Sequence, residues 1–211
     1  LVGTPPSSIG KFGYDTDNWM WPRHTGDFSI FRVYTDTLGN AAEYDKSNIP
    51  LKPKFFFDLS LNGVEEGDFT AILGFPGTTN RYDISDEIVQ YRDIVNAARI
   101  NMRQAKLSRM EELMLADPKT RIQYASKYST SSNYWKNAIG MNRGIKRLKV
   151  IEEKRKAEDD FCKWAMENGR QGYAEALDSM RVALDSLYDI KYQYYMLYEG
   201  RRNGTEFANI P

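Results

Sequence analysis

One short segment of the chain, residues 13–34, gathers side chains that are suited to chemistry. It runs Gly-Tyr-Asp-Thr-Asp-Asn-Trp-Met-Trp-Pro-Arg-His-Thr-Gly-Asp-Phe-Ser-Ile-Phe-Arg-Val-Tyr, so two tryptophans, several acids and the chain's single histidine, His24, lie close together. Loops that are held by a rigid scaffold carry many of the binding and catalytic residues of proteins. Because this cluster directly precedes an apolar run, it indicates a functional site.

Asp27 is the acid that stands at the start of that apolar run, residues 28–34, which is rich in β-branched and aromatic residues and predicts a strand. A buried carboxylate at the start of a strand can accept the ring N–H of a histidine and so fix its tautomer and orientation. The alternative is a turn aspartate that caps a backbone N–H. Taken alone, Asp27 fits the turn better, because aspartate is a common turn former.

Other clusters of reactive side chains fit structural roles better. The serines at 126 and 129–132 have no Gly-x-Ser-x-Gly motif around them and fall within a helical pattern, so we interpret them as caps and surface residues. The acidic pairs lack the histidine spacing of a metal site, and residues 15–18 lack the downstream glycine and glutamate of a calcium loop. Cys162 is interpreted as a buried apolar residue. No metal or cofactor is predicted.

The chain changes character near residue 80. Residues 1–79 contain most of the glycine and proline, with short apolar runs between turn signals that predict strands over 28–34, 54–59 and 69–73. Residues 83–200 contain one proline, Pro118, and follow long helical patterns. The sequence therefore predicts an α+β protein with a domain boundary between residues 79 and 80.

Amphipathic helices are predicted throughout the second part. From Asp86 to about Leu115, most apolar residues recur every three or four positions. Asp117 followed by Pro118 fits an N-cap and a first helical position. The full set of predicted helices covers residues 86–115, 118–128, 131–139, 144–168 and 172–198, with stops at glycines 140, 169 and 200. The tyrosines at 192–198 have two interpretations, either core packing or contact with a part of the protein outside this chain.

Composition narrows the classes of function. Of the 211 residues 41% are hydrophobic and 27% are charged, as in ordinary globular proteins. The formal net charge is zero, so no basic field for nucleic acid is predicted. No apolar run approaches the ~20 residues of a membrane-spanning helix. The chain begins Leu-Val-Gly-Thr-Pro-Pro without an initiator methionine, and we expect it to be an internal piece of a longer protein.

Two patterns resemble those of trypsin-like serine proteases. The run Asp-Phe-Ser-Ile-Phe-Arg-Val from Asp27 resembles the Asp-Ile-Ala-Leu-Leu-Arg-Leu pattern that carries the triad aspartate in chymotrypsin-like proteases. Residues 58–77, Asp-Leu-Ser-Leu-Asn-Gly-Val-Glu-Glu-Gly-Asp-Phe-Thr-Ala-Ile-Leu-Gly-Phe-Pro-Gly, resemble a second landmark of HtrA-type proteases, in which a Gly-Asp turn leads into an apolar strand. The order and separation of the two patterns also fit, which raises Asp27 to a triad candidate.

A longer match points to a narrower family. Residues 11–27, Lys-Phe-Gly-Tyr-Asp-Thr-Asp-Asn-Trp-Met-Trp-Pro-Arg-His-Thr-Gly-Asp, resemble the signature of the bacterial dipeptidyl peptidase 7 and 11 family. Residues 74–82, 121–128 and 133–136 are similar to further segments of that family. The resemblance covers most of the chain and becomes looser toward its C-terminal end.

The resemblance implies a chymotrypsin-like double β-barrel with an inserted helical domain that caps the cleft. It assigns Asp27 as the triad aspartate, and Asn18 and Trp19 as the residues that bind the free α-amino group of the substrate. Their chemistry suits that role, because an ammonium favours a carbonyl acceptor and an aromatic face. Trp21 is interpreted as a packing residue. Tyr14 departs from the pattern, since many members have glycine there.

His24 is not assigned as the triad histidine, because it lies only three residues before Asp27 and a separate edge of the barrel presents the imidazole in such triads. In the family the catalytic histidine lies upstream and the nucleophilic serine far downstream, so both are expected outside this chain. The expected function is that of part of a serine dipeptidyl aminopeptidase, which releases dipeptides from peptide N-termini. Residues 1–79 would form part of the barrel and residues 80–211 the helical lid, and the chain alone would be inactive.

The resemblance also implies peptide substrates, no cofactor, a homodimeric parent protein and a location in the periplasm, outside the cell or at its surface. Two other functions remain open on the sequence. One is a non-enzymatic helical protein-interaction module with a β-rich docking arm. The other is a regulatory HtrA-type endopeptidase, which would have a peptide-binding domain after the serine and no helical insertion.

Overall fold

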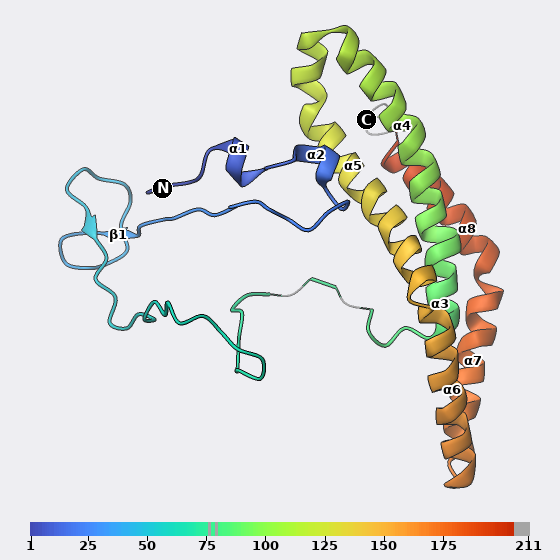
Figure 1. Ribbon diagram of the computed structural model, residues 1–211. Helices are drawn as coiled ribbons and strands as arrows, with labels where there is room; N and C mark the ends of the chain where they lie inside the picture. Colours follow the sequence, from blue (N-terminus) through green and yellow to red (C-terminus); the bar gives the residue numbers. More distant parts are fainter. Residues whose placement is uncertain (76, 79, 205–211) are drawn as a thin grey trace. The chain divides into compact units, whose positions relative to one another are not determined.

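The computed structural model describes residues 1–75, 77–78 and 80–204, and it is mostly helical with one small sheet (Figure 1). The predicted helical second part is thereby confirmed. None of the helices within the described residues is long and apolar enough to cross a membrane.

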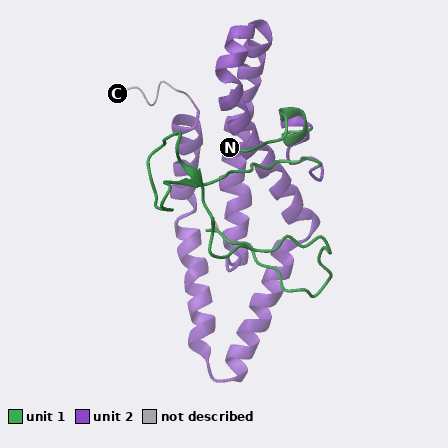
Figure 2. Cartoon of the chain, turned by 90° about the vertical axis from the view of Figure 1, so that its left-hand side faces the viewer, with its two compact units in different colours: residues 1–12, 24–79 green, residues 13–23, 80–211 purple. Residues whose placement is uncertain are grey.

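The chain divides into two compact units (Figure 2). One unit comprises residues 1–12 and 24–79, and the other comprises residues 13–23 and 80–211. The segment 13–23, which carries two of the predicted site residues, therefore belongs to the helical unit.

The first unit has little regular secondary structure. Helix α1 (Ser7–Gly10) is a single turn. Strand β1 (Tyr34–Thr35) pairs antiparallel with β2 (Ile49–Pro50), with Tyr34 opposite Pro50 and Thr35 opposite Ile49. One isolated antiparallel bridge joins Gly3 to Ile30.

The strands predicted over 28–34, 54–59 and 69–73 are wrong for this structure, apart from the start of β1 at Tyr34. A strand needs a neighbour that pairs with its backbone N–H and C=O groups, and isolated pairs of strands are marginally stable in water. Among the described residues of the first unit, ladder partners are confined to the bridge at Gly3 and to β2.

Apolar side chains of the first unit remain largely uncovered. Phe55, Phe57 and Ile72 are 91%, 90% and 99% exposed. Their runs have the composition of buried strands, but no other described element of the unit packs over them. Pro76, in the motif that closes the predicted third strand, and Thr79 lie outside the described residues.

The helical unit begins at α2 within the segment 13–23 and resumes after residue 80. Its elements are α2 (Tyr14–Asp17), α3 (Ser85–Gln90), the π-helix η1 (Tyr91–Asn96), α4 (Ala97–Ala116), α5 (Pro118–Arg147), α6 (Val150–Glu167), α7 (Gln171–Ser186), α8 (Tyr188–Leu197) and the π-helix η2 (Tyr198–Arg202). Helices α4 and α5 pack against each other, and so do α6 and α7.

The predicted cap of α5 is confirmed. The carboxylate of Asp117 accepts the backbone N–H of Thr120 at 2.9 Å and its hydroxyl at 2.7 Å, and Pro118 occupies the first helical position. Asp117 thereby ends α4 and starts α5 at one residue.

Helix α5 is longer than the sequence predicted. The two helices expected over 118–128 and 131–139 are a single helix of 30 residues that continues through Gly140 and Gly144. A glycine inside a helix costs about 1 kcal/mol, which packing against a neighbouring helix can offset. The expected stop at Gly140 is therefore wrong.

The remaining boundaries are partly as predicted. Gly169, with φ of +65°, follows α6 as the predicted cap. The helix expected over 172–198 is divided at Leu187 into α7 and α8, and helical structure continues past Gly200 in η2.

The core of the helical unit lies along the facing sides of these helices. Ile94, Ala138 and Ala165 are fully buried, and Ile151 is 6% exposed. Three large apolar residues within the predicted helix 144–168 are exposed, namely Leu148, Phe161 and Trp164. Cys162, which was interpreted as buried, is half-buried. Phe161 instead stacks on Trp164 and on Tyr173 near the α6–α7 turn, and Tyr192 and Tyr194 are also exposed.

Two buried carboxylates fasten the helices to one another. Glu199, which is 1% exposed, accepts hydrogen bonds from Arg103 Nε at 2.9 Å and Arg99 Nε at 3.2 Å. Both guanidinium groups also lie over the ring of Tyr134. Because a buried charge is costly unless it is paired and hydrogen-bonded, this cluster fixes η2 against α4 and α5.

Glu158 of α6 joins three helices. Its carboxylate accepts the backbone N–H of Ser85 at 2.6 Å and the Ser85 hydroxyl at 2.8 Å, so a side chain of α6 caps the first turn of α3. Arg181 of α7 donates to the same carboxylate at 2.9 Å. Burial alone would raise the pKa of Glu158, but the hydrogen bonds from Ser85 and Arg181 outweigh it and lower the pKa.

The lowered pKa makes the stability of the helical unit depend on pH. Because the folded-state pKa lies below the ordinary value of 4.5, the contribution of Glu158 is present above pH 4.5 and is lost as the pH falls through the lowered pKa. Thermal unfolding followed by circular dichroism between about pH 6 and pH 3 should show a smaller decrease in Tm for Glu158→Gln than for the wild type. The exposed Glu112→Gln is the control, and equal pH slopes for Glu158→Gln and the wild type would contradict the account.

Candidate functional site

The segment that carries Asn18 and Trp19 turns sharply before it reaches them. Gly13 has φ of +79°, and a Cβ atom there would lie 2.3 Å from Oδ2 of Asp17. Glycine is therefore required at this turn. The short helix α2 follows, and the chain passes through Asn18 to Trp19, whose φ is +61°.

One side chain of α5 holds Asn18 and Trp19 together. The amide oxygen of Asn133 accepts a hydrogen bond from Asn18 Nδ2 at 2.9 Å and another from Trp19 Nε1 at 2.8 Å. The two lone pairs of a single carbonyl oxygen thus fix both predicted residues. Asn18 and Trp19, which are adjacent in sequence, are oriented by a residue more than a hundred positions away.

The rest of this cluster is polar and partly open to solvent. Arg23 Nη2 donates to Asn18 Oδ1 at 2.7 Å, and that oxygen keeps a second lone pair. The Trp19 side chain has its N–H engaged, yet the residue remains 52% exposed. An acceptor oxygen beside an accessible aromatic face can bind a small cation such as an alkylammonium.

Two further residues of α5 contact the segment. Ser129 Oγ donates to Asp15 Oδ1 at 2.8 Å, and Lys136 Nζ donates to the carbonyl oxygens of Asp15 and Thr16, the latter at 3.0 Å. Ser129, Asn133 and Lys136 are spaced four and three residues apart, so they lie on one face of the helix. The segment 13–23 contacts α5 through that face.

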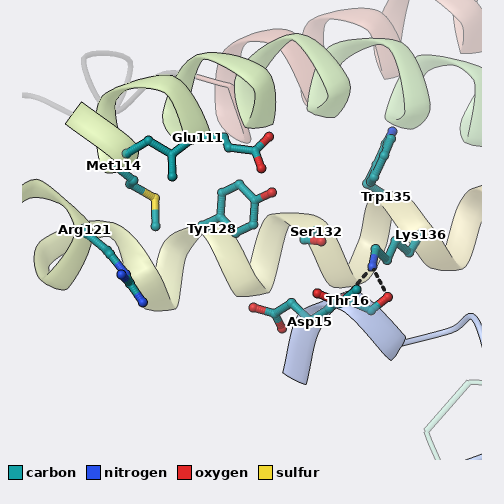
Figure 3. Close-up of a pocket in the computed structure, with 10 residues that line it drawn as sticks. Asp15, Thr16, Glu111, Met114, Arg121, Tyr128, Ser132, Trp135 and Lys136 are labelled. Atoms are coloured by element: carbon teal, nitrogen blue, oxygen red, sulfur yellow. Dashed lines mark hydrogen bonds between the residues drawn. The ribbon is translucent and has the colours of Figure 1, made fainter. Parts of the chain in front are cut away.

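A hollow of about 390 Å³ lies between α2, α4 and α5 (Figure 3). Burial raises the pKa of the Tyr128 phenol there, and the charges of Glu111 and Asp15 raise it further. Its lining mixes charged and aromatic side chains, among them Asp15, Glu111, Arg121, Tyr128, Trp135 and Lys136. Within the described residues, no group of three or more histidine, cysteine, aspartate or glutamate side chains gathers as metal ligands.

The structure brings Asn18 and Trp19 together in the helical unit, whereas Asp27 and His24 belong to the first unit. Asp27 is exposed, and no strand starts at it. Its assignment to a triad remains a prediction.

Asn133 is a site residue that the sequence did not single out. Its neighbourhood, residues 133–136, was recognised only as a family segment, although Asn133 and Lys136 have the spacing of a shared helix face. The nearby serines were also misjudged, because Ser131 and Ser132 are both 3% exposed and not surface residues. A prediction of α5 at its full length would have placed these serines, Asn133 and Lys136 on one helix.

Comparison with known proteins decides the family. The model of the family described as peptidase S46 matches residues 1–211. The chain belongs to the peptidase S46 family.

The chain is also similar to known dipeptidyl peptidases. It is 48% identical to the Asp/Glu-specific dipeptidyl-peptidase of Porphyromonas gingivalis over 211 residues, and 47% identical to dipeptidyl-peptidase 7 of Phocaeicola vulgatus over 208 residues. These matches cover 100% and 99% of the chain but 29% of each relative.

A solved crystal structure is also similar. The crystal structure of Porphyromonas endodontalis DPP11 in complex with the dipeptide Arg-Asp superposes with a TM-score of 0.84 at 45% identity, over 100% of this chain and 30% of that one. The chain therefore spans about 30% of the length of these relatives. The resemblance to dipeptidyl peptidases is confirmed, and a non-enzymatic interaction module is not favoured.

Proposed function

We propose that the protein to which this chain contributes is a serine dipeptidyl aminopeptidase, which releases dipeptides from the N-termini of peptides. In it Asn18 and Trp19 bind the α-amino group of the substrate, and Asp27 is the aspartate of the catalytic triad. The observation that carries the proposal is the shared acceptor, Asn133, which orients Asn18 and Trp19 side by side.

The amine site explains how such an enzyme would select the second peptide bond for cleavage. A free α-ammonium carries three donors and a positive charge, so it can bond to Asn18 Oδ1 and lie against the exposed face of Trp19. Binding the terminus at a fixed place sets the second peptide bond at the nucleophile. Productive register then depends on the amine, which is how exopeptidase specificity would arise.

Asp27 would act through a histidine. In a serine triad the aspartate accepts the histidine's N–H, the histidine takes the proton of the serine hydroxyl, and the serine oxygen attacks the scissile carbonyl. The histidine later donates that proton to the leaving amine. We infer that both partners lie outside these 211 residues, so the chain alone should lack peptidase activity.

The first unit would supply part of a chymotrypsin-like barrel in the parent protein. Its exposed apolar residues include Phe55, Phe57 and Ile72. They lie in runs with the composition of strands, which would become buried when further strands pair with them. Residues 80–211 would form the helical domain that closes over the cleft. Homodimerisation and a periplasmic or extracellular location accompany this proposal by family resemblance.

The amine site can be tested in the full-length enzyme. Asn18→Ala removes an acceptor for a charged donor, an interaction worth about 1.5–3 kcal/mol, so kcat/KM for a fluorogenic dipeptidyl substrate should fall roughly 10- to 100-fold. The exposed Asn101→Ala is the matched control. An N-acetylated substrate, which has no ammonium, should be a poor substrate for the wild type and little affected by Asn18→Ala. An unchanged kcat/KM on the free-amine substrate would refute the assignment.

Asp27 predicts a different kinetic signature. Asp27→Asn keeps the shape of the side chain but removes the charge that steadies an imidazolium, so kcat should fall by roughly 10³- to 10⁴-fold. KM for the dipeptidyl substrate should change little, because Asp27 does not bind the amine. Full kcat in Asp27→Asn would show that Asp27 is the turn residue of the alternative interpretation.

A further inference from the structure

The segment that presents Asn18 and Trp19 has a backbone that its own residues disfavour. Tyr14 and Trp19 have φ of +47° and +61°, in the left-handed region that costs non-glycine residues about 1–2 kcal/mol each. Helix α2 has only four residues and no side-chain cap at its start. Contacts from outside the segment must therefore hold this conformation.

Lys136 supplies the contact with the backbone itself. Its ammonium donates to the carbonyl oxygens of Asp15 and Thr16, which are two of the carbonyls that so short a helix leaves without helical partners (Figure 3). Hydrogen bonds from a charged donor are roughly twice as strong as neutral ones. Lys136 is half-buried, which reduces the competition from water.

The other contacts of α5 differ in kind. Asn133 binds the side chains of Asn18 and Trp19, and Ser129 binds the side chain of Asp15. Among these contacts, that of Lys136 reaches main-chain atoms of α2, two and three residues before Asn18. Because Asp15 and Thr16 precede Asn18 in the chain, the Lys136 contact fixes the backbone position from which Asn18 and Trp19 extend.

We propose that Lys136 is a positioning residue for recognition of the substrate's N-terminus: by holding the α2 carbonyls, it places Asn18 and Trp19 in the geometry that receives the ammonium. This inference rests on the proposed function of Asn18 and Trp19. Lys136 itself does not touch the substrate. Its removal should weaken binding of the free amine without impairing the chemical step.

Full-length enzyme variants test this role. Lys136→Met keeps the length of the side chain but removes the donors, and it should raise KM for a free-amine dipeptidyl substrate about tenfold with kcat within about twofold of the wild type. Lys136→Arg keeps a cationic donor and should restore most of the affinity. Lys146→Met, on an exposed part of the same helix, is the matched control and should behave like the wild type.

The kinetic constants of Lys136→Met are compared with those of Asn18→Ala, and the thermal unfolding midpoint of Lys136→Met is compared with that of the wild type. A raised KM in Lys136→Met with an unchanged midpoint, and rescue by arginine, supports the positioning role. An unchanged KM in Lys136→Met while Asn18→Ala is impaired overturns this inference and leaves the amine site standing. An unchanged kcat/KM in both variants overturns the amine site as well. A loss in Lys136→Met that appears in kcat, or that follows a lowered midpoint, also overturns the positioning role.

Discussion

The amide oxygen of Asn133 accepts two hydrogen bonds from neighbouring residues of a distant segment, and the arrangement of the candidate site depends on this junction. A backbone with Trp19 at φ of +61° does not persist by itself, so α5 must fix it. The face of α5 that does so extends from Ser129 to Lys136. The segment 13–23 therefore belongs to the helical unit, although it lies in the N-terminal part of the sequence.

The junction requires that α5 itself be held rigidly. The Asp117 cap begins the helix, and α4 packs along it. Next to Asn133, the ring of Tyr134 lies against the guanidinium groups of Arg99 and Arg103, which buried Glu199 binds. A charged cluster one residue from the junction thus ties the C-terminal helices to the site-bearing face, and Glu158 performs a similar role for α3, α6 and α7.

Sequence patterns predicted the helical part well because amphipathic periodicity and caps are local signals. The stripe of α4 and the Asp117 cap were both visible in the sequence. Gly140 misled, because the cost of a helical glycine is small beside packing that the sequence does not display. The strand predictions were wrong because strand pairing is not local. The composition of 54–59 and 69–73 favours strands, but a strand forms only where another segment pairs with it.

In the candidate site, too, some residues could be found from the sequence and others could not. Asn18 and Trp19 were assigned by resemblance, and the chemistry of an ammonium made sense of them. Asn133 was not found, because its role depends on a contact over more than a hundred residues. Ser129, Asn133 and Lys136 share a helical face, but that spacing has meaning only once the segment is known to lie on it.

A double-mutant cycle in the full-length enzyme tests most directly whether Asn133 acts through the pair it holds. The quantity is kcat/KM for a free-amine dipeptidyl substrate in Asn133→Ala, in the Asn18→Ala/Trp19→Ala variant, and in the three combined. We expect Asn133→Ala to lower kcat/KM about tenfold in the wild type and to have little effect once Asn18 and Trp19 are replaced by alanine. Losses that simply multiply would contradict it, because Asn133 would then act independently of the residues it contacts.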